Sequence, residues 1–114
     1  MKKACFLVIL AVMAVYACST EPQSVVDKAL HVYGNCEKCK ARIENASKIK
    51  GVSHQNWNID SKLLSCKIDT VITSVDELLK IIAKAGHDNE LYPADDYVYD
   101  KLPVTCQYER VEHN

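Results

Sequence analysis

The stretch Val-Tyr-Gly-Asn-Cys-Glu-Lys-Cys-Lys, residues 32–40, decides the fold that we predict for this chain. It has the pattern of a strand end, a glycine turn and two cysteines at the start of an amphipathic helix. Cys36 and Cys39 are three residues apart, so on one helical turn their thiols point into the same small volume. The positive end of the helix dipole favours thiolate there. Two thiolates bind soft ions such as Cu(I), Zn or Hg(II), or they oxidise to a disulfide, and the pattern itself leaves both open.

Regular patterns continue on both sides of this stretch. A capping box formed by Ser74 and Glu77 opens a second helix, and Gly86 closes it. Gly51 ends the segment of the first helix, and Pro93 stops the last strand. We predict strands over residues 28–33, 52–59, 63–69 and 87–92, and helices over residues 36–48 and 75–85. This β-α-β-β-α-β order predicts an α+β, ferredoxin-like sandwich with a four-stranded antiparallel sheet, two helices on one face and a C-terminal tail.

The N-terminal residues have the pattern of a targeting segment. Lys2 and Lys3 precede an uncharged apolar run over residues 6–17, which is short for a membrane span and typical of a signal peptide. Ala17 before Cys18 resembles a bacterial lipobox, so we expect cleavage before Cys18 and lipidation of that thiol, with simple secretion or an uncleaved anchor as alternatives. The predicted organisation is a lipoprotein signal peptide (1–17), a lipidated Cys and tether (18–26), one domain (27–92) and a tail (93–114).

Composition excludes several classes of function. The 114 residues carry a formal net charge of −1, with no basic run and no interleaved aromatics, so we expect no nucleic-acid partner. No nucleophile–base set, phosphate-binding loop or paired carboxylates stand out, so we expect no enzyme.

Beyond Cys18, four cysteines remain. Cys66 is at an inward strand position and fits a small core residue. The tail could bring Cys106 to the cysteine pair as a third sulfur ligand, or as the partner in a disulfide.

Three short stretches together resemble the heavy-metal-associated domain family, which includes copper chaperones, domains of copper-transporting ATPases and mercury-binding proteins. They are residues 33–39, Lys-Gly-Val at 50–52 and Ala-Gly-His-Asp at 85–88. The resemblance implies that Cys36 and Cys39 hold Cu(I), and that His87 lies near the metal loop as a candidate ligand or hydrogen-bond partner. Asn35 stands where that family usually has Met.

These observations predict an extracytoplasmic soft-metal-binding protein that buffers the ion or hands it on through the thiolate pair. Cu(I) is the expected ion, with Zn and Hg(II) as alternatives. We expect a monomer in the cell envelope, held by its lipid anchor and facing the periplasm or the cell exterior. Its partner would be a metal-transporting ATPase or another metal acceptor. The alternatives are a thiol–disulfide redox module using the same cysteines, and an interaction domain that binds no metal.

Overall fold

A computed structural model describes residues 24–110 and 112. The expectations for the signal peptide and for Cys18 concern residues outside this described part. Within it, three strands, three α-helices and one short 3-10 helix follow one another, and none of the helices is long and apolar enough to cross a membrane. They are β1 (Val25–His31), α2 (Glu37–Ala46), β2 (Val52–Trp57), β3 (Leu63–Asp69), α3 (Val75–Lys84), α4 (Asp96–Asp100) and the 3-10 helix η2 (Val104–Cys106).

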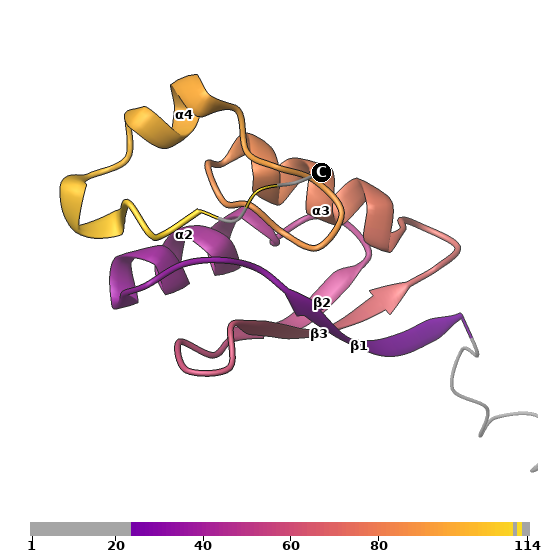
Figure 1. Ribbon diagram of the computed structural model, residues 1–114. Coiled ribbons are helices and arrows are strands. Elements are labelled where there is room, and N and C mark those ends of the chain that lie inside the picture. Colours follow the sequence, from indigo (N-terminus) through magenta and orange to yellow (C-terminus); the bar gives the residue numbers. More distant parts are fainter. Residues whose placement is uncertain (1–23, 111, 113–114) are drawn as a thin grey trace, which may run out of the picture.

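The sheet is antiparallel, with β3 between β1 and β2. Figure 1 shows α2 and α3 on the same side of this sheet, with the tail that carries α4 also on that side. The predicted inward face of β3 is confirmed, because Leu64, Cys66 and Ile68 are all buried. On this face of the sheet they pack with the apolar side chains of α2 and α3. Trp57 is also fully buried, and its indole N–H donates a hydrogen bond to the Val32 carbonyl at 2.9 Å. The result is one apolar core between sheet and helices.

The predicted fourth strand over residues 87–92 is wrong. The structure has a three-stranded sheet, and this segment contributes only an isolated bridge between Val32 and Asn89. The reason is local turn chemistry: the Asn89 side-chain oxygen accepts hydrogen bonds from the backbone N–H groups of Leu91 (3.2 Å) and Tyr92 (3.0 Å). The chain therefore curls away from β1 before it can extend the ladder.

The helix ends differ in how closely they follow the sequence. Ser74 caps α3 as predicted, since its hydroxyl accepts a hydrogen bond from the Glu77 N–H, and Gly86 follows the helix with a φ of +107°. The first helix is shorter than the predicted 36–48. Ser47 is the C-cap of α2, and Gly51, with a φ of +94°, lies just before β2 instead of ending the helix.

Candidate metal centre

The first two sulfur atoms lie at the start of α2. Cys36 is the N-cap residue, with extended backbone, and is half-buried, whereas Cys39 is in the first turn and fully buried. Because the two residues are one helical turn apart, their Sγ atoms lie 3.4 Å from each other. The loop before them packs tightly: a Cβ on Gly34 would lie 3.0 Å from both Cys39 and the Trp57 ring. The core thus fixes the loop from below.

A third sulfur comes from the tail. Cys106 is fully buried, and its Sγ lies 3.5 Å from that of Cys36, although 70 residues separate the two in sequence. The three Sγ atoms all lie within 4.8 Å of one another, and in the part of the chain that the structure describes they form the one group of three or more His, Cys, Asp or Glu ligands close enough to share a metal ion. The Cys106 thiol therefore lies beside the cysteine pair, a placement that the sequence had left open.

The two thiols of the pair lie in different electrostatic surroundings. Burial acts to raise the pKa of Cys36, but hydrogen bonds from Cys39, from the Cys106 thiol and from the Lys38 backbone outweigh it, and the pKa is lowered. Burial raises the pKa of Cys39 to about 11. Of these two thiols, Cys36 therefore forms the thiolate more readily. Binding of a soft cation would release a proton from Cys39, because the thiolate is the ligand form.

Asn35 contributes directly to this centre. Its side-chain oxygen accepts a hydrogen bond from the Cys39 thiol at 3.3 Å, and the same thiol also lies 3.8 Å from the Cys106 carbonyl oxygen. A polar side chain at this position thus orients the buried Cys39 thiol. In this chain Asn35 accepts a hydrogen bond from the Cys39 thiol, at the position where the heavy-metal-associated domain family usually has an apolar Met.

His87 lies beside the tail and is not a member of the three-sulfur group. Its Nδ1 donates to the Tyr33 carbonyl at 2.8 Å, so Nε2 is the acceptor that faces the Arg42 guanidinium at 3.5 Å. The ring is fully buried and stacks on Tyr108 with 5.3 Å between ring centroids. Burial, aided by Arg42, lowers the pKa of His87 to about 4, so the imidazole is neutral near pH 7. These contacts fasten the loop after α3.

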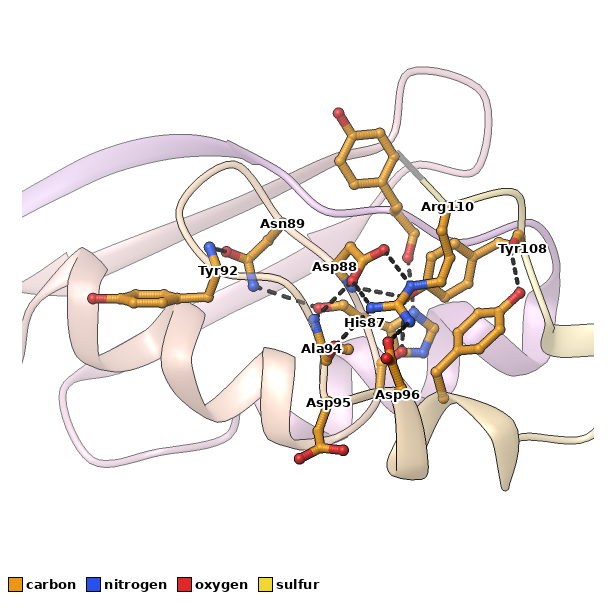
Figure 2. Close-up of polar contacts among 12 residues, drawn as sticks. His87, Asp88, Asn89, Tyr92, Ala94, Asp95, Asp96, Tyr108 and Arg110 are labelled. Carbon is orange, nitrogen blue, oxygen red and sulfur yellow. Dashed lines mark hydrogen bonds and ion pairs between the residues drawn. The ribbon is translucent and has the colours of Figure 1, made fainter. Parts of the chain in front are cut away.

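The tail is held by a polar network around Asp88, which Figure 2 shows with the Arg110 guanidinium between two carboxylates. Arg110 bonds Asp88 through two nitrogens, at 3.0 and 2.9 Å, and also bonds Asp96 (2.6 Å) and the Ala94 carbonyl (2.7 Å). Asp88 is fully buried, and its carboxylate also accepts from the Ala94 N–H at 2.7 Å. Such a buried carboxylate is stabilised by a partner of opposite charge, and the docked tail supplies one in Arg110.

Sequence reasoning assigned no role to Asp88, Tyr108 or Arg110. The signals were modest: a Tyr-Glu-Arg run close behind Cys106, and an Asp directly after the histidine of the second loop. Nothing in the spacing of two segments about 20 residues apart indicates that an arginine of one will pair with a carboxylate of the other. Only the folded tail brings them together.

Comparisons with known proteins support the fold. No protein-family model matches the chain, and no curated protein matches it. Among solved structures, a CopZ metallochaperone superposes with a TM-score of 0.53 and 27% identity, over 56% of this chain and 98% of that one. Oxidized MerP from Ralstonia metallidurans CH34 gives a TM-score of 0.55 and 28% identity, over 58% of this chain and 94% of that one. The chain is thus similar to these small proteins over little more than half its own length.

Both neighbours are matched over nearly their whole chains, so the likeness extends over most of each neighbour's fold. The α+β architecture and the position of the cysteine pair at the start of α2 agree with it. The described domain therefore has a heavy-metal-associated-like fold, and it carries a cluster of three cysteines that suits a soft metal ion.

Proposed function

We propose that this protein binds a soft metal ion, Cu(I) above all, at the Cys36–Cys39 thiol pair, and that it buffers the ion or passes it on. The observation that carries the proposal is the sulfur cluster: two thiols 3.4 Å apart at the start of α2, with a third thiol 3.5 Å from the first. Thiolate sulfur selects Cu(I), Zn and related thiophilic ions over hard cations such as Mg²⁺ and Ca²⁺. The likeness to a metallochaperone supports the same assignment.

The unequal exposure of the pair gives a route for transfer. Cys39 is fully buried, whereas Cys36 is half-buried and has the lowered pKa. An acceptor thiolate can approach the ion from the side of Cys36 and replace the Cys36 thiolate as a ligand, while Cys39 still binds the ion. Each exchange forms one metal–sulfur bond as another breaks, so no free ion is released. We therefore propose binding and transfer, with no enzymatic step.

The cellular setting belongs to the same proposal. The lipobox-like sequence before Cys18 supports a lipid-anchored protein of the cell envelope, with the domain facing the periplasm or the exterior. An anchored metal-binding domain would meet an acceptor at the membrane, such as a metal-transporting ATPase. Mass spectrometry of the protein purified from membranes would test the anchor, because lipidation adds the mass of acyl chains to a peptide that begins at Cys18.

A competition titration tests the metal site. The fully reduced protein is titrated with Cu(I) against a chromophoric chelator, and then with Zn and Hg(II) separately. We expect one tightly held Cu(I), lost in the Cys36→Ser variant. The matched control is Cys66→Ala, which removes a buried thiol outside the cluster and should leave the affinity unchanged. If reduced wild-type protein competes for none of the three ions, the proposal fails and a redox or protein-interaction role takes its place.

A further inference from the structure

The tail is fastened to the domain on both sides of Cys106. Before it, Leu102 packs against Gly86, where an added Cβ would lie 3.0 Å from a Leu102 methyl group. After it, Tyr108 and Arg110 dock on the loop that follows α3. Between these anchors, η2 turns the chain so that the Cys106 N–H bonds the Pro103 carbonyl at 2.7 Å. Residues on both sides of Cys106 therefore help to set the position of its thiol, in addition to the contact between the Cys39 thiol and the Cys106 carbonyl.

The Tyr108 hydroxyl makes two hydrogen bonds with the loop after α3. It accepts from the Asp88 N–H at 2.7 Å and donates to the Gly86 carbonyl at 2.8 Å. Its ring is buried, stacks on the His87 ring and makes a T-shaped contact with the Tyr99 ring. A buried hydroxyl that fills both its donor and acceptor roles is specific for one docking position, since a shift of the tail would leave both backbone groups without this partner.

Arg110, two residues after Tyr108, contacts the same loop after α3. Its guanidinium lies 4.7 Å from the centre of the Tyr99 ring and forks onto the fully buried Asp88. Two parallel hydrogen bonds between a guanidinium and a carboxylate fix an angle as well as a distance. Tyr108, Arg110 and Asp88 together form what we call the tail latch.

We propose that the tail latch positions Cys106 as a third sulfur ligand, so that the ion is held by three thiolates while the latch is closed and by two when it opens. This inference rests on the proposed function. Tyr108 and Arg110 are positioning residues: they act on the ion through the backbone that connects them to Cys106. Opening of the latch by an acceptor protein would lower the hold on the ion and favour its transfer through the exposed Cys36 side.

The experiment measures Cu(I) affinity by chelator competition and the number of sulfur ligands by X-ray absorption. The variants are Arg110→Gln, Cys106→Ser and the double substitution, with Lys67→Gln as a control that removes a surface ion pair with Asp27. We expect three sulfur ligands in the wild type and two in both single variants. Each single variant should bind Cu(I) 10–100-fold more weakly, as is usual when support of a metal ligand is lost.

The double variant separates positioning from general stability. If Arg110 acts only through Cys106, then Arg110→Gln causes no further loss of affinity in the Cys106→Ser background. Losses that multiply would overturn the inference, because they would mean that Arg110 supports the cysteine pair directly. The milder Tyr108→Phe keeps the stacked ring, removes both hydroxyl bonds and should also yield two sulfur ligands. It covers the case in which Arg110→Gln does not fold.

Two further outcomes are distinct from each other. Tight Cu(I) binding by only two sulfur atoms in the wild type overturns the latch inference and leaves the proposed function standing. Absence of Cu(I) binding in the wild type, as in Cys36→Ser, defeats the proposed function itself. Three sulfur ligands retained in both Arg110→Gln and Tyr108→Phe would show that Cys106 is held without the latch, which also overturns the inference.

Discussion

The three clustered cysteines differ in how far their thiols are exposed to solvent. Cys36 is half-buried and has a lowered pKa, whereas Cys39 and Cys106 are fully buried and the pKa of Cys39 is raised to about 11. Thiol chemistry follows the thiolate fraction and access to solvent. In the metal-free protein the Cys36 thiol is therefore accessible to reagents in solvent, whereas the Cys39 and Cys106 thiols are shielded from them.

Alkylation of the reduced, metal-free protein should follow this order. At neutral pH we expect iodoacetamide to modify Cys36 first among the four described cysteines, with Cys39, Cys66 and Cys106 reacting later. Peptide mass spectrometry after short exposures measures the order. As a control, the urea-unfolded protein should react at similar rates at all four positions. Equal rates in the folded protein would contradict the described burial.

His87 should make stability depend on pH. Its pKa is lowered to about 4 in the folded protein and is about 6.5 when unfolded, so between these values the unfolded chain binds the extra proton. Stability from this group is present above about pH 6.5 and is lost as the pH falls toward 4, with a slope of at most about 1.4 kcal/mol per pH unit. Urea unfolding between pH 4.5 and 7.5 measures it.

Two variants make this pH test specific. His87→Phe should flatten the slope because the titrating group is gone, even if the variant is less stable at pH 7. The matched control is His54→Asn at an exposed position with a φ of 56°, a conformation that Asn tolerates. A slope that survives His87→Phe would place the titrating group elsewhere.

At the scale of elements, strong periodic patterns predicted the structure best. The β3 strand runs from Leu63 to Asp69 as its alternation predicted, and the capping box located the start of α3. The missing fourth strand shows where this reasoning stops. Residues 87–92 have strand-like composition, but the Asn89 side chain bonds the backbone two and three residues ahead and bends the chain. A single polar side chain outweighed the pattern of six residues.

The candidate site was predictable in its local half only. Cys36 and Cys39 are neighbours on one helical turn, so their spacing in sequence determines their spacing in space. Cys106 was a candidate because the tail could bring its thiol to the pair. The docking of that tail involves the contact between Asp88 and Arg110, which no periodic pattern in the sequence indicates. Periodic patterns in a sequence predict helices and strands. They do not predict which polar residues far apart in the chain will pair after folding.

The cap of α3 gives a prediction about stability. Replacing Ser74 by Ala removes the acceptor for the Glu77 N–H and should cost about 1 kcal/mol. For a domain of this size that corresponds to a fall in Tm of roughly 4–8 °C. Thermal unfolding followed by circular dichroism measures it. Ser65→Ala, at an exposed position in β3, is the control and should change Tm much less.

At the scale of the whole molecule, the tail and the sheet domain are joined by a buried ion pair as well as by apolar contact. Asp88 is fully buried and Arg110 is its cationic partner at 2.9 Å. Removal of one member of a buried pair costs about 3–5 kcal/mol, because the remaining charge loses its compensation. A substitution of Arg110 is therefore expected to weaken the docking of the tail.

Hydrogen exchange should reveal that release. In the wild type we expect protection of the Ala94 and Asp88 amides, which donate to buried acceptors. Arg110→Gln should speed exchange at Ala94 by about 100-fold or more while the β3 amides stay protected. Lys67→Gln serves again as the control. Equal loss of protection in β3 and the tail would mean that the two open as one cooperative unit.

The long sequence separation between Cys36 and Cys106 links metal binding to folding. In an unfolded chain Cys36 and Cys39 are still only three residues apart in sequence, so both can chelate a soft ion. Cys106, in contrast, is 70 residues from Cys36. A ligand stabilises the native state only by the affinity that it gains there over the unfolded state. The ion should therefore raise the melting temperature mainly through Cys106, and the Cys106→Ser protein should bind the ion yet gain little thermal stability from it.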